Sequence, residues 1–472
     1  MKILLTGANG YIAKRLLPVL VSKGHKVVCA VRDSNRLSIP EAMIDLVEII
    51  EVDFLNPPTL SVIPGDIDAA FYLIHSMSVS REFKLLESQC ATHFKKVIET
   101  TSCKHVIYLS GIVNENSLSD HLASRKMVED ELKSTKYHLT TFRAGIIIGS
   151  GSASFEIMRD LIEKLPLIVG PKWLQTKCQP IGIANVINIL ELSLFKAETF
   201  DRNFDIGGPD ILTYKEMLLG YAKARKMKRH IFVVPLMTPK LSSYWLYFIT
   251  STSYKLASAL VDSMKVEVVC RNTEINDIIG LKTFSYNEAL NRTMAVIEEN
   301  QIVSSWKDSF SSSNLKFKIS SFLEIPTFGC FIDKRVEVVE DIDQTISKIW
   351  AIGGDTGWYF LTILWQIRGF IDKLLGGVGL RRGRTNPKQI STGDAIDFWR
   401  VLFANKKEKR LLMFAEMKLP GDAWLEFKIT DGKLIQTATF RPKGLWGRLY
   451  WILLYPIHII IFKGMCYTIA KK

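Results

Sequence analysis

The sequence predicts an α/β fold built on a doubly wound parallel sheet, followed by a smaller α+β domain. Three observations lead to this prediction. Short apolar runs alternate with helical stripes near the start of the chain, a glycine-containing turn follows the first run, and turn-linked apolar runs fill the last part. The chain has 472 residues, of which 47% are hydrophobic and 23% charged. This composition is typical of a globular protein of two or three domains and excludes a mainly disordered or collagen-like one.

The first 150 residues alternate between predicted strands and predicted helices. An apolar run occupies residues 1–6, and a helical stripe follows it until Gly24. The further predicted strands are 25–32, 46–53, 69–74, 104–110 and the apolar run 137–148, and the further predicted helices are 81–101 and 121–134. Strands that alternate with helices form βαβ units, so we expect a parallel sheet.

The chain is expected to have two domains. Residues from about 150 to 300 carry further helical stripes and are expected to complete the sheet and add a substrate lobe, so the first domain is 1–300. Residues 301–314 contain six serines and no hydrophobic period, which favours a linker. In 315–472, apolar runs and turns predict an antiparallel sheet that grips a long C-terminal helix. These runs are 331–339, 394–403, 410–418, 423–429 and 434–442.

Basic residues are concentrated in the second domain. Residues 301–472 contain 26 Lys and Arg against 16 Asp and Glu, so 10 of the 13 excess positive charges lie there. This excess indicates an anionic partner or surface. Nucleic acid is not expected, because no helix-turn-helix, zinc-finger or RNP-type motif occurs. Basic clusters near the Trp-rich segment 445–451 leave peripheral contact with an anionic membrane open.

Cysteine content and apolar run length indicate where the protein works. Seven cysteines without a CxxC pair indicate neither a disulfide framework nor a metal site, and they fit the cytoplasm. The inner face of the membrane is the alternative location. The first predicted strand begins at residue 2 and leaves no room for a signal peptide ahead of it. The longest apolar run, 449–462, is shorter than the about 20 residues of a membrane span, so we interpret it as a core helix, with a membrane-dipping helix as the alternative.

The strongest motif is the turn between the first strand and the first helix, Thr6-Gly7-Ala8-Asn9-Gly10-Tyr11-Ile12-Ala13. In this context a glycine pattern marks a Rossmann dinucleotide-binding site. Gly7 permits the tight turn, Gly10 lets the backbone approach a pyrophosphate, and Ala13 permits close helix packing. The helix N-terminus offers amide donors to the phosphates. We therefore expect a nicotinamide nucleotide, with an ordinary glycine turn as the alternative. The expected contacts are Gly7, Asn9, Gly10, Tyr11 and Ile12.

The ends of the second and third strands bear on the choice of cofactor. An acid after the second strand usually binds the ribose 2′-hydroxyl of NAD, whereas an arginine suits the 2′-phosphate of NADP. Arg32 stands there with Asp33 beside it, so we expect NADP and leave NAD open. Asp53 and Phe54 close the third strand, where the carboxylate could meet the adenine amine. A turn cap is the alternative for Asp53.

These features together resemble the short-chain dehydrogenase/reductase superfamily, and more closely its atypical, NmrA-like branch. The resemblance rests on the Thr-Gly-x-x-Gly-x-x-Ala turn, Arg32, Asp53 and Ser110-Gly111. Further stretches, similar to one bacterial subgroup, extend it over nearly the whole chain. They include 72–77, 121–125, 143–145, 149–156, 179–181, 205–209, 242–245, 398–401, 415–417, 420–421 and 456–458. The resemblance implies an NAD(P)-binding oxidoreductase joined to a helix-grip, lipid-binding-like domain of unknown function.

One departure from the superfamily concerns the catalytic pair. Active members carry Tyr-x-x-x-Lys on the helix after the serine strand, where the lysine lowers the pKa of the phenol. Here that helix has His121-x-x-x-Arg125. A histidine can exchange a proton near pH 7, and an arginine can stabilise an oxyanion. Ser110, His121 and Arg125 are therefore the candidate catalytic set. The alternative is that His121 and Arg125 only support the cofactor or the surface.

Two further residues are placed by the predicted sheet. His75 ends the fourth strand and Arg143 ends a later run, both at the carboxyl edge where ligands bind. Each could contact cofactor or substrate, and a structural role is the alternative.

Two functions of different classes remain open. The first is an NADP-dependent oxidoreductase that acts on an apolar carbonyl or quinone-like substrate. The second is a non-catalytic NADP(H)-binding sensor or structural module coupled to lipid or to a membrane-associated complex. The missing Tyr-x-x-x-Lys favours the second.

Overall fold

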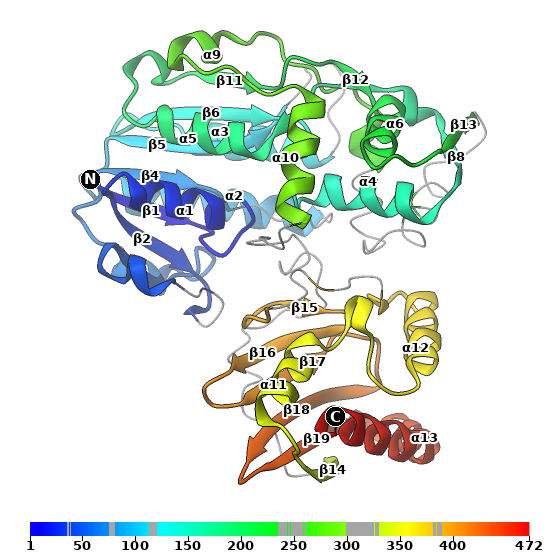
Figure 1. Cartoon of the computed structure of the whole chain (residues 1–472). Coiled ribbons are helices and arrows are strands. Elements are labelled where there is room, and N and C mark those ends of the chain that lie inside the picture. The colour runs from blue at the N-terminus through cyan, green and yellow to red at the C-terminus, as the bar shows by residue number, and fades with distance from the viewer. Residues whose placement is uncertain are drawn as a thin grey trace. The chain divides into compact units, whose positions relative to one another are not determined.

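The chain forms two compact units, Met1–Trp306 and Lys307–Lys472 (Figure 1). The computed structural model describes residues 1–34, 37, 39–74, 81–112, 120–234, 243, 246, 258, 261–298, 325, 330–380, 384 and 389–471. The linker predicted at 301–314 lies outside these residues.

The first unit is organised around a seven-stranded sheet in the order β11-β6-β5-β4-β1-β2-β3 (Figure 1). All six strand pairs are parallel, which confirms the predicted doubly wound sheet. Most strands are continuous apolar runs because helices cover both faces. The strands are β1 Lys2–Thr6, β2 Lys26–Val31, β3 Val47–Glu51, β4 Ala69–Tyr72, β5 His105–Gly111, β6 His138–Ala144 and β11 Asn203–Ile206.

Helices cover the two faces of this sheet. One face packs against α1 Ala13–Ser22, α5 Ile183–Leu192 and α9 Glu274–Ile279. The other packs against α2 Arg81–Ile98 and α3 Asp120–Glu131. In α1 the buried residues follow the helical stripe of the sequence, which shows why this segment lies along the sheet.

A lobe formed by segments that follow β6 has its own apolar cluster. Its helices are α4 Ala153–Lys164, α6 Tyr214–Ala224 and α10 Tyr286–Glu298. Its short strands pair as β7 Ile147–Ile148 with β10 Ile181–Gly182, β8 Leu167–Pro171 with β13 His230–Val234, and β9 Lys177–Cys178 with β12 Leu212–Thr213. The predicted run 137–148 is thus divided between β6 and β7. The division falls at Gly145, where a Cβ would lie 3.2 Å from the Gln179 carbonyl oxygen.

The second unit is a six-stranded antiparallel sheet in the order β14-β19-β18-β17-β16-β15. Its strands are β14 Phe331–Val338, β15 Ala395–Ile396, β16 Trp399–Asn405, β17 Arg410–Ala415, β18 Gly421–Thr430 and β19 Lys433–Pro442. The helix α13, Gly444–Ala470, packs along β14 and β19. This arrangement confirms the predicted sheet with a long C-terminal helix. Two helices that the sequence analysis did not assign, α11 Ile342–Ala351 and α12 Thr362–Leu374, also contribute to the interior.

The helix α13 has a buried face and an exposed face. Phe462, Met465 and Ile469 belong to the core of the second unit, whereas Leu453 is 75% exposed. By length and composition α13 is long enough and apolar enough to cross a membrane, a property that core helices can share. The run 449–462 lies inside α13, and its residues divide between the two faces.

Candidate functional site

The turn after β1 brings the backbone against the end of β4. Gly7 has φ +61°, and a Cβ there would lie 3.0 Å from the Leu73 carbonyl oxygen. The amide of Gly10 donates a hydrogen bond to the Gly7 carbonyl at 2.7 Å. A Cβ on Gly10 would lie 2.9 Å from that same oxygen. The turn therefore requires glycine at both positions.

Thr6 fixes this turn to the sheet. Its hydroxyl donates to the Phe71 carbonyl at 3.0 Å and accepts from the Leu73 amide at 3.1 Å. These two bonds continue the contact between β1 and β4 beyond the last paired residues of the strands. The glycine turn thus starts from a rigid point at the carboxyl edge of the sheet.

The start of α1 fits a pyrophosphate. No side chain caps the helix, and Ala13, which is 1% exposed, lets the helix pack closely on the sheet. Gly7, Gly10 and Ile12 are partly exposed. The amides of Lys14, Arg15 and Leu16 donate to the carbonyls of Gly10 and Ile12, whereas the amides of Ile12 and Ala13 donate to no backbone carbonyl among the described residues. Such amides at a helix start attract anions. An uncapped helix start beside two glycines without Cβ atoms is the cradle that a dinucleotide requires.

Of the residues expected to contact the cofactor, Tyr11 has a side chain that is already engaged. Arg15 lies over the Tyr11 ring with its guanidinium carbon 4.1 Å from the ring centroid, and donates to the Ser150 carbonyl at 2.8 Å. Burial raises the pKa of Tyr11 to about 12. The Tyr11 phenol therefore packs in the protein, and only its backbone is placed to meet a phosphate.

Arg32 and Asp53, which follow β2 and β3, both lie near Cys90 of α2. Burial is the main cause that raises the pKa of the Cys90 thiol. The charge of Asp53 raises this pKa further, and the charge of Arg32 lowers it. Arg32 is exposed, whereas the neighbouring Asp33 is only 1% exposed.

The residues that close the third strand also have partners in the protein. Asp53 accepts from the Leu55 amide at 3.1 Å, so the carboxylate serves at least as a turn cap. Phe54 is buried against Phe94.

Ser110 and Arg125 both lie near Tyr108 towards the end of β5. Ser110 is 2% exposed and lies next to Tyr108 on the same face of the strand. Burial raises the pKa of Tyr108 to about 12, and the nearby Arg125 opposes this rise. His121 stands one helical turn before Arg125 on α3, but its side chain lies outside the described part of the structure, as does the whole of His75. Ser110 and Arg125 thus share Tyr108 as a neighbour, and the catalytic set stays a prediction.

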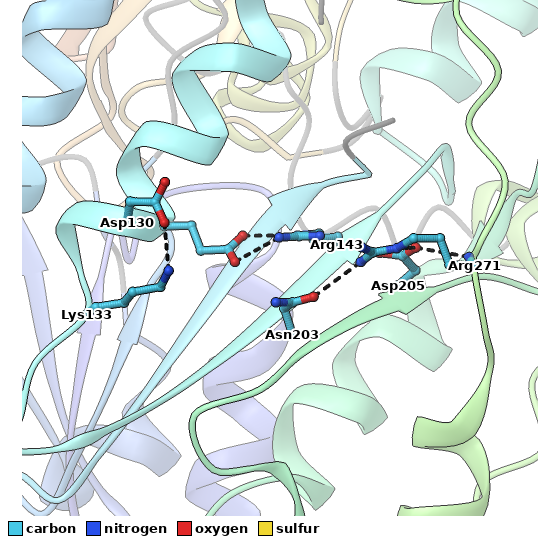
Figure 2. A network of polar contacts seen from close by, with 7 residues as sticks. Asp130, Lys133, Arg143, Asn203, Asp205 and Arg271 are labelled. Carbon is cyan, nitrogen blue, oxygen red and sulfur yellow. Dashed lines mark hydrogen bonds and ion pairs between the residues drawn. The ribbon is translucent and has the colours of Figure 1, made fainter. Parts of the chain in front are cut away.

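Arg143 is engaged in the buried ion pair drawn in Figure 2. Its Nε and Nη2 atoms donate to the two carboxylate oxygens of Glu129 at 3.0 and 2.8 Å. The two side chains are 9% and 6% exposed. The pair joins α3 to β6, and this geometry favours the structural interpretation of Arg143.

A second ion pair continues this network on β11. Asp205, which is paired in register with Arg143, accepts two hydrogen bonds from the Arg271 guanidinium at 2.8 and 2.9 Å (Figure 2). The sequence analysis assigned no role to Glu129 or Asp205. The spacing from His121 through Arg125 to Glu129, four residues each, places all three on one face of α3 and could have indicated Glu129.

Comparison with known proteins agrees with this geometry. The family model described as NAD(P)H-binding matches residues 7–156, and the model described as a protein of unknown function, DUF2867, matches residues 331–465. No match was found among the curated proteins.

Solved structures share the fold of the first unit at low sequence identity. The NADPH-dependent quinone oxidoreductase QOR2 of Escherichia coli, complexed with NADPH, has 14% identity and a TM-score of 0.51, with 62% of this chain and 99% of that chain covered. A nucleoside-diphosphate-sugar epimerase of Staphylococcus aureus has 12% identity and a TM-score of 0.50, covering 61% and 99%. The triphenylmethane reductase of Citrobacter sp. has 15% identity and a TM-score of 0.50, covering 62% and 100%.

The first unit is thus an NAD(P)H-binding domain, and it shares its fold with the quinone oxidoreductase and the epimerase. In this chain the domain is joined to a DUF2867 domain, which the structure shows as an antiparallel sheet with a long C-terminal helix. The match to the NAD(P)H-binding family model confirms the expected NAD(P) cofactor.

Gly7→Asp and Gly10→Asp are each expected to abolish NADPH binding, because a carboxylate would fill the cradle and repel the pyrophosphate. Isothermal titration calorimetry measures this. Gly24→Asp is the matched control, since Gly24 also has a positive φ (+77°) but no atom lies within 4 Å of its Cβ position. Wild-type NADPH affinity in the Gly7 variant would refute the site.

Glu129→Ala is expected to lower the free energy of unfolding by about 3–5 kcal/mol, because it leaves a buried arginine without its partner. Asp130→Ala, next along α3, removes an exposed pair with Lys133 and is expected to cost at most about 1 kcal/mol. Urea unfolding of the full chain measures both. Similar small losses in the two variants would contradict a structural role for the Glu129–Arg143 pair.

Proposed function

We propose that the first unit is an NADPH-dependent oxidoreductase of the atypical, NmrA-like type that reduces an apolar carbonyl or quinone-like substrate. The observation that carries this proposal is the position of Ser110 and Arg125. Each lies near Tyr108 towards the carboxyl end of β5, in the same sheet whose β1 leads into the nucleotide cradle. In doubly wound sheets this edge is where cofactor and substrate bind.

The chemistry of these side chains suits carbonyl reduction. NADPH, when bound, supplies a hydride from its nicotinamide ring. Arg125 remains protonated and would stabilise negative charge that develops on the substrate oxygen. The Ser110 hydroxyl would hold that oxygen, and His121, one turn along α3, would deliver a proton near pH 7. Tyr108 is no substitute for the missing catalytic tyrosine, since burial holds its pKa at about 12.

The preference for NADPH is supported by the end of β2. Arg32 is exposed and Asp33 is buried, so the guanidinium rather than the carboxylate faces outward. An exposed arginine at this place suits a 2′-phosphate. The names of the quinone oxidoreductase and the triphenylmethane reductase support the proposed class of substrate, a conjugated apolar acceptor.

A non-catalytic NADP(H)-binding module is the second candidate. The observation that favours it is the composition of α3, which carries His121 and Arg125 where active superfamily members carry tyrosine and lysine. In addition, Glu129 neutralises the buried Arg143, which is therefore no free charge for substrate binding. In such a module, NADPH binding to the first unit would change the binding properties of the second unit.

NADPH oxidation against a panel of quinones, enones and ketoacyl compounds distinguishes the two candidates. The oxidoreductase predicts turnover with at least one quinone or enone, and a loss of 10²-fold or more in kcat for Ser110→Ala and His121→Ala. Ser102→Ala, on the same unit but away from this edge, is the control. Tight NADPH binding without turnover of any compound would support the module instead.

Arg32→Ala is expected to weaken NADPH binding about 10- to 100-fold and to leave NADH binding almost unchanged, because a charged hydrogen bond to the 2′-phosphate is lost. Calorimetry with each nucleotide measures the two affinities. Lys136→Ala removes one exposed positive charge elsewhere in the unit and serves as the control. An equal loss for NADPH and NADH would show that Arg32 does not recognise the phosphate.

For the second unit we infer contact with the inner surface of an anionic membrane, with the protein otherwise in the cytoplasm. An exposed apolar stripe runs along α12 and the first half of α13. It consists of Ile363, Ile367, Phe370, Leu374, Trp446, Ile452 and Leu453. The segment 444–470 contains no acidic residue, and Arg448 and Lys463 on it are exposed. An apolar surface flanked by positive charge is typical of proteins that lie on anionic bilayers.

Leu453→Glu is expected to abolish flotation of the full chain with phosphatidylglycerol vesicles, since it places a negative charge in the middle of the stripe. Phe232→Glu is the control, because Phe232 is equally apolar and 59% exposed but belongs to the first unit. Binding should weaken in high salt and with phosphatidylcholine vesicles. Flotation that the Leu453 variant retains would rule out this surface.

A further inference from the structure

The interior of the second unit contains polar side chains that lack hydrogen-bond partners. Gln436 is 1% exposed, and neither its amide nitrogen nor its amide oxygen has a partner within the described part of the unit. The same holds for Asp333 Oδ2, His458 Nδ1 and the Trp365 and Trp399 indole nitrogens. These groups come from the sheet and from the helices α12 and α13, which are segments far apart in the sequence.

The strand register places the sheet members of this set on one face. Gln436 of β19 is paired with Arg335 of β14, and Asp333 precedes Arg335 by two residues, so all three point to the same side. That side is the one on which α13 packs. On α13, His458 lies between Trp451 and Phe462, with ring centroids 5.1 Å away in both cases.

His458 of α13 and Trp365 of α12 lie close to this face of the sheet. Asp333 and Arg368 both act electrostatically on His458. Trp365 of α12 contacts the Phe462 ring at 6.1 Å between centroids. The side chains of Asp333, His458 and Trp365, each with an unpartnered atom, therefore lie in one part of the interior, next to Phe462.

The charges in this region are balanced within the protein. Asp333 and Arg335 form an ion pair at 2.6 Å. Arg368 donates to the Lys418 carbonyl at 3.0 Å and lies 3.7 Å from the Asp372 carboxylate. Burial lowers the pKa of His458 to about 4, so its ring is neutral at pH 7. The hydrogen-bond donors and acceptors that lack partners therefore belong to a region without net charge.

Other buried polar groups of the same unit are well paired. Arg400 and Glu416, both 0% exposed, form an ion pair at 3.0 Å, and Arg400 also donates to the Gly393 carbonyl. Asp397 accepts from the Trp358 indole at 3.0 Å. Buried polar groups in proteins are almost always hydrogen-bonded, and leaving one unpaired is costly. The unpaired set is therefore a local feature, of the kind found where a binding partner completes the hydrogen bonds.

We propose that the interior of the second unit binds an uncharged amphiphile, whose hydroxyl or carbonyl end pairs with Gln436, Asp333 and His458. The apolar body of this molecule would lie against Trp365, Phe462 and the other rings of the core. The unpaired oxygen of Asp333 would repel an anion. A cation would be held weakly, because the Asp333 carboxylate already forms an ion pair with Arg335. This proposal concerns a site separate from the nucleotide cradle and does not depend on the proposed reaction.

The test uses three probes with the same chain and different heads: decanol, decanoate and decyltrimethylammonium. Binding to the full chain is followed by tryptophan fluorescence, since seven of the ten tryptophans belong to the second unit. We expect saturable binding of decanol, with the two charged probes at least 10-fold weaker. No decanol binding, or decanoate binding as tight as decanol, would overturn the proposal.

The Gln436→Leu variant separates a ligand-binding role from a structural one. It removes two unsatisfied polar atoms, so we expect the thermal midpoint of the second unit without probe to rise by roughly 2–4 °C. Decanol affinity should fall at least 10-fold. Gln436→Met, closer in shape, provides the same readouts if the leucine variant does not fold. Gln344→Leu, at an exposed position, is the control. A lower midpoint with unchanged decanol affinity would show that Gln436 is structural and would overturn the proposal.

Discussion

The contact between the glycine turn after β1 and the end of β4 is the constraint on which the functional half of the molecule depends. Gly7 can approach the Leu73 carbonyl only because it has no Cβ, and its φ of +61° turns the chain from strand to helix in a few residues. The Thr6 hydroxyl holds both strands at this point. The orientation of α1, and with it the direction of the Ile12 and Ala13 amides, follows from these contacts.

The same edge of the sheet is supported on its other side by ion pairs. Glu129 holds α3 to β6 through Arg143, and Arg271 holds the segment before α9 to Asp205 on β11. Buried pairs of this kind contribute little net stability but define a single arrangement of the elements they join. α3 carries His121 and Arg125, so the Glu129–Arg143 pair keeps Arg125 near Tyr108. Positioning of the candidate catalytic residues thus depends on residues that do not touch substrate.

The sequence allowed prediction of the sheet and the cradle, because buried parallel strands appear as apolar runs and the turn has a specific glycine pattern. The two-residue strands β7, β9, β10 and β12 are too short to show any period. Helix α12 was missed because its exposed face is also apolar, so no polar side marks it in the sequence. Glu129 resembles any charged residue of a helix surface until the strand that carries Arg143 is placed beside it. The unpaired state of Gln436 depends on the packing of α13 over β14 and β19, which no local pattern reports.

The amides of the turn and of the start of α1 are proposed to hold the diphosphate of a nicotinamide nucleotide. Hydrogen exchange followed by mass spectrometry, with and without NADPH, measures this contact. We expect strong slowing of amide exchange in the peptide that contains residues 7–13, together with the peptide that contains Arg32. Slowing confined to other parts of the chain, with exchange in 7–13 unchanged at saturating NADPH, would contradict it.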